Sequence, residues 1–169
     1  MSAPIGADAV LLARRTPARR VASAVRLVAA RARARGRLTV GRGVWLAAGA
    51  RIDVAPGARV RLGDAVELGA GARVTAAAAG CSIAIGERTR IGDRAVVSGV
   101  TGIEVGADAL LGEWTFVGDA DTGLDAPAPL RIGAGARLGA HATVGPGGQV
   151  PDGGVVGSYA LVRAPRSPA

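Results

Sequence analysis

The residues best suited to proton-transfer chemistry lie in the last third of this 169-residue chain. His141 is its only histidine, and imidazole is the side chain that exchanges a proton near neutral pH. Asp119 and Asp121 lie in the stretch 119–123, which reads DADTG. A carboxylate serves as a general base at neutral pH only when its surroundings raise its pKa. The chain therefore offers one imidazole and two carboxylates as candidate catalytic groups.

The elements that must hold these groups form a repeat. An aliphatic residue, any residue, a second aliphatic residue and a glycine recur five times, at steps of 22, 23, 20 and 27 residues. A finer period of six runs through the repeat, with an aliphatic residue opening each hexad and a small or β-branched residue four places later. Neither a helix nor an alternating strand produces a sustained period of six, and a disordered Gly/Ala-rich segment would lack the regular openers. The five motifs begin at Leu38, Val60, Ile83, Ile103 and Leu130.

Three hexads predict one turn of a triangular prism, and a repeat of this length indicates a solenoid. Each opener points into a narrow interior, while the small residue fills a corner that a bulky side chain would overpack. Openers stack on their copies one coil away, at about 4.8 Å, and form parallel sheets. We therefore expect an all-β solenoid, a parallel β-helix over 38–164, between a basic N-terminal helical segment at 1–37 and a C-terminal tail at 165–169.

The longest step, 27 residues, predicts a loop at 119–129. After Val117 the hexad register would place Asp121 at an inward position, where an unpaired carboxylate carries a large desolvation cost. The chain is therefore expected to leave the prism there. Carboxylates in an open loop are more often solvated turn residues than bases, so both interpretations of Asp119 and Asp121 stay open.

One outward slot of the prism gathers side chains that are rare in this chain. His141 is the fourth residue of its hexad, and this slot points outward. Stacking predicts that these side chains form one external column. The column is either the core of a subunit interface or the wall of a ligand cleft, and in a trimer whose sites lie between subunits it can be both. In a cleft, His141 is the base or a hydrogen-bond partner, and its neighbours in the column contact the substrate. Successive coils carry Gly49, Gly71, Arg94, Trp114, His141 and Tyr159 in this slot.

The net charge of +8 is confined to the first 37 residues, where nine of the 21 arginines accompany a single acid. The remaining residues carry twelve arginines and twelve acids. Thr16 and Pro17 favour a helix start, and Gly36 favours its end. Between them lies an apolar stripe, which we expect to cap the first coil; the alternative is contact with an anionic membrane surface or another polyanion. The stripe consists of Val21, Ala24, Val25, Val28 and Ala32.

The remaining features favour a cytoplasmic protein. A single cysteine, Cys81, excludes an internal disulfide, and its place in a Gly/Ala-rich turn favours an unreactive thiol. The first apolar stretch, at 9–13, is too short for a secretory signal and runs into Arg14 and Arg15. No recognised nucleic-acid motif and no basic stripe on the folded body are present, so no nucleic-acid partner is expected.

The strongest resemblance to a known family is carried by residues 129–162, which read PLRIGAGARLGAHATVGPGGQVPDGGVVGSYALV. This stretch resembles the C-terminal pattern of the left-handed parallel β-helix, or hexapeptide-repeat, acyltransferases, which include maltose, galactoside and serine acetyltransferases. The resemblance extends from Val40 to Arg163, about three quarters of the chain. It implies a left-handed coil, a homotrimer, and acetyl-CoA or another acyl-CoA in a groove between neighbouring subunits. The γ-type carbonic anhydrases have a similar repeat but need three histidines for zinc, so no metal is expected.

The same resemblance implies roles for particular residues. In sugar acetyltransferases of this family, a loop similar to 119–129 reads roughly Asp-x-Asp-His-Gly, and its histidine is the general base. Thr122 stands at that place here as a candidate substrate contact, and a threonine hydroxyl takes no proton near neutral pH. His141, Asp119 and Asp121 are then the candidate catalytic residues. The cofactor contacts implied by the resemblance are Ala140, Gly145, Gly157, Ser158 and Arg163.

Two functions from different classes follow. The first is transfer of an acetyl or other small acyl group from acyl-CoA to a hydroxyl or amine of a small-molecule acceptor, such as a sugar. The second is a catalytically inactive β-helix that serves as a scaffold or binding module, which Thr122 favours. A third is a polymerising structural solenoid, which the loop at 119–129 and a capped N-terminus both disfavour.

Overall fold

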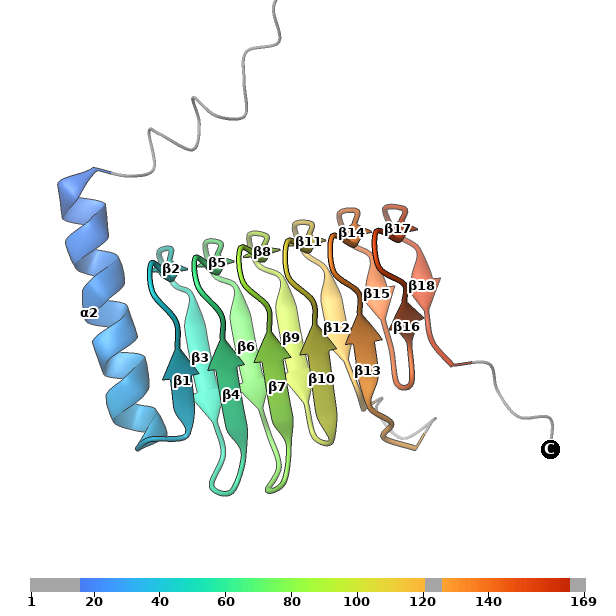
Figure 1. Ribbon diagram of the computed structural model, residues 1–169, viewed down its shortest axis with the longest axis horizontal. Helices are drawn as coiled ribbons and strands as arrows, with labels where there is room; N and C mark the ends of the chain where they lie inside the picture. The colour runs from blue at the N-terminus through green and yellow to red at the C-terminus, as the bar shows by residue number, and fades with distance from the viewer. Residues whose placement is uncertain (1–15, 121–125, 165–169) are drawn as a thin grey trace, which may run out of the picture.

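The computed structural model describes residues 16–120 and 126–164. Within these residues the chain forms one α-helix, labelled α2, followed by eighteen short strands that coil into a parallel β-solenoid. Three six-stranded parallel sheets form its walls, and each coil contributes one strand to each sheet (Figure 1). In Figure 1 the chain rises through the near sheet, crosses over the top and descends through the far sheet as it advances to the right, which is a left-handed coil. The predicted left-handed parallel β-helix with an N-terminal helical segment is therefore confirmed.

The three sheets are named here by the order in which the chain visits them. Sheet A contains β1 (Leu38–Val40), β4 (Arg59–Leu62), β7 (Ser82–Ile85), β10 (Gly102–Val105), β13 (Leu130–Ile132) and β16 (Gln149–Val150). Sheet B contains β2 (Trp45–Leu46), β5 (Glu67–Leu68), β8 (Arg90–Ile91), β11 (Leu110–Leu111), β14 (Arg137–Leu138) and β17 (Val155–Val156). Sheet C contains β3 (Arg51–Val54), β6 (Arg73–Ala76), β9 (Val96–Gly99), β12 (Phe116–Gly118), β15 (Thr143–Val144) and β18 (Leu161–Val162).

Hydrophobic openers stack on one another from coil to coil. In sheet A, Leu62 pairs with Ile85, and in sheet C, Val97 pairs with Val117. Parallel pairing at one-coil intervals brings like residues together, so the period of six in the sequence becomes one continuous apolar core. The largest fully buried side chains are Leu46, Leu62, Leu68, Ile83, Ile85, Ile91, Ile103, Leu111, Ile132, Leu138, Val60 and Val66.

Small residues fill the corners between the sheets. Thr89 is fully buried at one corner, and its hydroxyl donates a hydrogen bond of 2.7 Å to the carbonyl of Gly106 in the next coil. The glycine that follows an opener reflects the close approach of neighbouring coils. A Cβ atom on Gly63 would lie 2.6 Å from the backbone nitrogen of Glu87. The repeat therefore needs a residue without a side chain at this place.

The corner between β6 and β7 departs from the predicted register. The hexad pattern places Ala78, four residues after Val74, at the buried small position. The strand instead continues two residues past Val74, to Ala76, and the turn after it is one residue longer than the turn between β3 and β4, so Cys81 fills the corner, with 1% of its surface exposed. The pairing of Arg59 with Ser82 aligns Cys81 with the corner of the preceding coil. Burial raises the pKa of the Cys81 thiol, and the nearby Asp119 carboxylate adds to the rise. A buried thiol with a raised pKa is poorly reactive.

Helix α2 (Pro17–Ala34) lies across the N-terminal end of the solenoid (Figure 1). The buried Ser23 hydroxyl accepts a hydrogen bond of 2.9 Å from the backbone N–H of Leu46. The Arg26 guanidinium donates to the carbonyl of Leu46 at 3.1 Å, and that of Arg31 donates to the carbonyl of Val40 at 3.1 Å. These bonds satisfy backbone groups of the first coil that no further strand could pair with.

The helix docks through a different face from the predicted one. Its buried residues are Ser23, Ala30 and Ala34. The valines of the predicted capping stripe face away from the solenoid, and the prediction that this stripe covers the first coil is wrong. An open strand edge presents N–H and C=O groups at close range, so small and hydroxyl side chains dock there better than branched apolar ones. The exposed fractions are 64% for Val21, 62% for Val25 and 66% for Val28.

The ends of α2 follow from local sequence. Pro17 occupies the first helical turn, but the Thr16 side chain makes no capping hydrogen bond. Arg35 and Gly36 both adopt left-handed backbone conformations, which ends the helix. Over residues 16–120 and 126–164, no helix is both long and apolar enough to cross a membrane.

Candidate functional site

Four side chains stack in one external column where sheet B turns into sheet C. The Arg94 guanidinium carbon lies 4.8 Å from the centre of the Trp114 ring. The rings of Trp114 and His141 are 6.0 Å apart and parallel within 5°. The rings of His141 and Tyr159 are 4.8 Å apart and parallel within 4°. We call these four residues the aromatic ladder; the hexad register predicted their alignment, and the ring contacts show it.

The backbone explains why these side chains align. All four ladder residues adopt left-handed conformations, with φ between 56° and 61°. Each backbone N–H from Arg94 onward donates to a carbonyl of the preceding coil, as in the bond of 2.9 Å from His141 to Glu113. The turn geometry is therefore repeated at each coil and projects each side chain in the same direction. The same slot holds Gly49 and Gly71 in the first two coils, where φ is 72° and 69°.

His141 lies between the two aromatic rings of the ladder. Trp114 covers one face of the imidazole and Tyr159 covers the other, so its ring edge is the part that a ligand reaches. Its side chain is exposed at the surface. No hydrogen bond to its ring nitrogens comes from the described part of the chain, so stacking alone orients the imidazole there. The imidazole is therefore oriented by stacking and accessible to solvent, and it is not part of a buried pair of catalytic groups.

An apolar surface surrounds the ladder. Phe116 and Leu161 lie on the outer face of sheet C, two positions after Trp114 and Tyr159 respectively. Their exposed fractions are 42% for Phe116, 58% for Leu161, 48% for Trp114 and 76% for Tyr159. We call these four residues the corner patch. Clustered exposed aromatic and aliphatic side chains of this kind mark surfaces that contact a partner or ligand.

Asp119 has a different environment from the one expected of a base. It is fully buried, and its carboxylate accepts hydrogen bonds from the backbone N–H groups of Val100, Thr101 and Gly102 at 2.7, 2.7 and 2.6 Å. The Thr101 hydroxyl donates a fourth bond at 2.7 Å. Asp119 therefore holds together the corner between β9 and β10, and its oxygens face donors of the protein rather than a substrate. The other two loop candidates, Asp121 and Thr122, lie outside the described residues.

The candidate cofactor contacts fall into two groups at opposite ends of β15 and β18. Ala140, Gly157 and Ser158 adjoin the ladder, where the Tyr159 N–H donates to the Ala140 carbonyl at 3.0 Å. At the other end of these strands, the Gly145 N–H donates to the carbonyl that precedes Arg163, at 2.7 Å. The outer face of sheet C joins the two groups.

Two grooves beside the ladder were not expected from the sequence. One of about 260 Å³ crosses the outer face of sheet B, and a second of about 430 Å³ lies between α2 and the same sheet. Trp45 lines both, and Glu67 and Arg90 in the first groove form an ion pair of 3.7 Å. Outward strand positions carry no six-residue period, so the sequence offered only an isolated tryptophan as a signal.

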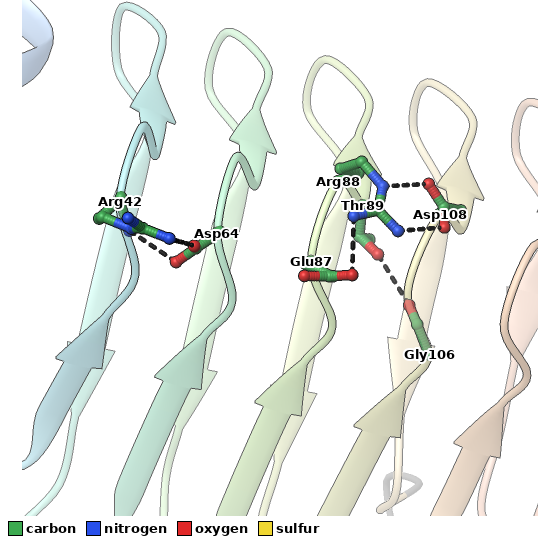
Figure 2. A network of polar contacts seen from close by, with 7 residues as sticks. All are labelled: Arg42, Asp64, Glu87, Arg88, Thr89, Gly106 and Asp108. Atoms are coloured by element: carbon green, nitrogen blue, oxygen red, sulfur yellow. Dashed lines mark hydrogen bonds and ion pairs between the residues drawn. The ribbon is translucent and has the colours of Figure 1, made fainter.

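The corner between sheets A and B carries charges instead of rings (Figure 2). Arg42 pairs with Asp64 at 3.1 Å, and Arg88 pairs with Asp108 at 2.8 Å and with Glu87 at 2.7 Å. Hydrogen bonds from the backbone and side chain of Arg42 lower the pKa of Asp64. Those from Arg88 lower the pKa of Asp108, and the two carboxylates raise the pKa of Arg88. We call these five residues the charged corner.

No protein-family model matches the chain, and no curated protein matches it. Fold and site geometry therefore define its class. The chain is a left-handed parallel β-helix protein of hexapeptide repeats, with an aromatic ladder on one corner. Within 16–120 and 126–164, no three His, Cys, Asp or Glu side chains lie close enough together to hold a metal ion.

Proposed function

We propose that this protein is a cytoplasmic acyltransferase similar to the hexapeptide-repeat acetyltransferases, which moves an acetyl or small acyl group from acyl-CoA to a hydroxyl or amine. The observation that carries the proposal is the exposed imidazole edge of His141, held in the aromatic ladder beside the C-terminal coils. A sugar is the acceptor class that the resemblance favours.

His141 supplies the proton transfer in this proposal. Its ring nitrogen takes the proton of the acceptor hydroxyl or amine, which makes the oxygen or nitrogen a stronger nucleophile. Trp114 and Tyr159 hold the imidazole plane by stacking on both faces. The acyl-CoA, when bound, supplies an activated thioester.

The outer face of sheet C fits an extended acyl-CoA arm. Backbone groups beside Gly157 and Ser158 lie at the ladder end of β18, and the Arg163 cation lies at its other end, where it suits a phosphate. An acyl-CoA arm that lies along this face approaches the exposed edge of the His141 ring. This fit supports Ala140, Gly145, Gly157, Ser158 and Arg163 as cofactor contacts.

We further propose a homotrimer in which the corner patch lies between subunits. Aromatic and aliphatic side chains exposed on a corner gain burial when copies associate, and a closed threefold arrangement repeats one contact at each of its three interfaces. The acceptor site would then lie between subunits. A residue of the neighbouring chain is then available to orient the His141 imidazole.

The first experiment measures acetyl-CoA binding by calorimetry and then turnover with sugar and amine acceptors. We expect binding, and we expect His141→Ala to lower kcat by roughly 10²–10⁴-fold with little change in acetyl-CoA affinity. Asp108→Asn, in the charged corner, is the matched control and leaves turnover unchanged. Absence of acetyl-CoA binding contradicts the proposal, and turnover that survives His141→Ala removes His141 as the base.

The second candidate function is a catalytically inactive binding module. It is favoured by Asp119, whose carboxylate is occupied by four internal donors. A trimer that binds ligand on its corner patch but turns over no acceptor supports this function. Measured turnover that depends on His141 excludes it.

A further inference from the structure

The outer face of α2 is apolar and uncovered by the rest of the described chain. Val21, Val25 and Val28 follow the spacing of one helix face and are each more than three-fifths exposed. The opposite face of α2 is occupied by its contacts with the first coil. The valine face is therefore turned away from the solenoid. Since α2 lies across the N-terminal end of the solenoid (Figure 1), this face lies beyond that end.

Positive charge borders this valine face on both sides. By helical spacing, Arg20 flanks one edge of the stripe and Arg33 flanks the other, whereas Arg26 and Arg31 reach back to carbonyls of the first coil. The span Pro17–Ala34 contains five arginines and no acid. Arginine side chains are long enough to bring their charges level with the valine surface. The α2 surface thus combines an apolar centre with a cationic rim.

The charge of this rim selects among occupants. A second copy docked on the same face would bring the arginines at the edges of the two valine faces together, which is unfavourable. A nucleic acid would pair with the arginines but would leave the valines without an apolar partner. A bilayer with anionic headgroups satisfies both features, since it offers negative charge at its surface and hydrocarbon just below.

We propose that α2 is a membrane-surface anchor, which lies in the plane of an anionic bilayer with Val21, Val25 and Val28 inserted. This inference goes beyond the acyltransferase proposal and does not depend on it. The bilayer then lies across the N-terminal end of the solenoid, because α2 covers that end (Figure 1) and its valines are on the face turned away from the coils. The β-helix projects from the membrane, and the aromatic ladder in its later coils stays in water.

The test is co-sedimentation of the full chain with vesicles of phosphatidylcholine alone or with added phosphatidylglycerol, at low and high salt. We expect binding to the anionic vesicles, weakened by salt. Val25→Asp should lower the affinity roughly tenfold or more, because a carboxylate replaces an inserted side chain. The double variant Arg20→Gln and Arg33→Gln should lower it roughly 25-fold, at about fivefold for each arginine.

Matched controls use equally exposed residues elsewhere on the surface. Val155 is 77% exposed on sheet B, so Val155→Asp makes the same chemical change away from α2. Arg59 and Arg61 are exposed on sheet A, so replacing both by Gln removes the same charge. Both controls should bind as the unchanged protein does. Circular dichroism melting checks folding, and Val28→Ser replaces Val25→Asp if the latter unfolds the helix.

Three results overturn the anchor. The first is no binding to anionic vesicles at low salt. The second is binding that Val25→Asp and Val28→Ser leave unchanged, since arginines alone then account for it and any polyanion serves equally. A loss with Val155→Asp equal to that with Val25→Asp also contradicts the proposal. None of these outcomes bears on acetyl-CoA binding, so the two proposals fail separately.

Discussion

The charged corner and the aromatic ladder use one backbone turn for different purposes. Arg88 and Asp108 on one corner, and Trp114 and His141 on the other, all have φ between 55° and 59°. Each N–H donates to the coil before it in the same way. The charged corner joins its side chains in ion pairs within the chain, whereas the ladder joins its rings face to face and leaves their edges open.

This difference indicates which corner of the solenoid is available to contact another molecule. Exposed ion pairs contribute little to stability, but a corner made of them exposes charged groups to water and not apolar surface. The ladder and the corner patch leave aromatic surface in water, which is unfavourable until another molecule covers it. The same backbone turn thus occurs on both corners. The residue types on each corner decide whether its side chains pair within the chain or are exposed to contact another molecule.

The largest effect on stability is expected at the third corner, which joins sheet C to sheet A. Between β9 and β10 this corner lacks the left-handed turn found on the other two corners. There the Asp119 carboxylate binds three backbone N–H groups directly. Asp119→Ala should lower the free energy of unfolding by about 3–5 kcal/mol, because it leaves buried donors unpaired. Urea denaturation measures this, and Asp119→Asn should show an intermediate loss. A loss no larger than that of Asp108→Ala would show that this corner, too, is held by its backbone.

The next effect concerns assembly. Trp114→Ala combined with Tyr159→Ala should weaken self-association roughly tenfold or more, since aromatic side chains dominate interface energies. Arg88→Ala on the charged corner is the control and should leave the oligomer unchanged. Sedimentation equilibrium over a range of concentrations provides the measurement. Equal behaviour of the two variants would remove the functional distinction between the corners.

A smaller effect tests whether both corners share one backbone requirement. Gly49 lies in the ladder slot and Gly135 in the equivalent slot of the charged corner, with φ of 72° and 65°. Valine at either position should cost about 1–2 kcal/mol of stability, because a β-branched residue fits the left-handed region poorly. Gly157 has open space around it and no positive φ, so Gly157→Val should be nearly neutral. Thermal melts of the three variants decide the matter, and unequal losses at Gly49 and Gly135 would argue against a common turn.

The coils were predictable because each inward residue meets its own counterpart one coil away. A period of six in the sequence therefore maps directly onto contacts such as that of Val97 with Val117. The same logic predicted the ladder, since a fixed slot points in a fixed direction. It failed at Cys81, because the strand continues two residues past Val74 and the turn that follows has one extra residue.

Contacts between distant parts of the chain were not predictable in this way. Ser23, Ala30 and Ala34 dock α2, although hydrophobicity alone favoured the valines, because the open edge of the first coil rewards small and polar groups. The backbone N–H groups that bind the Asp119 carboxylate lie 17 to 19 residues earlier in the chain, and no local sequence pattern predicts this contact. The loop position of Asp119 was clear from the 27-residue step, but its burial was not.

The smallest effect is the dependence of the charged corner on acid. Hydrogen bonds from Arg88 lower the pKa of Asp108 in the folded protein, so this pair stabilises the fold above the ordinary carboxyl pKa of about 3.9. The contribution is lost as the pH falls through the lowered pKa, where the folded carboxylate takes up its proton. Asp108→Asn should therefore be slightly less stable than the unchanged protein at pH 7 and equally stable in strong acid.

The effect stays small because both side chains are half exposed and solvent screens their charges. Urea denaturation of both proteins across the acid range tests it, with Tyr159→Phe in the ladder as a variant whose stability difference should not change with acid. If the Asp108→Asn difference persists unchanged in strong acid, the carboxylate acts there as a neutral acceptor. Charge would then not be what distinguishes this corner from the ladder, and the contrast would rest on aromatic exposure alone.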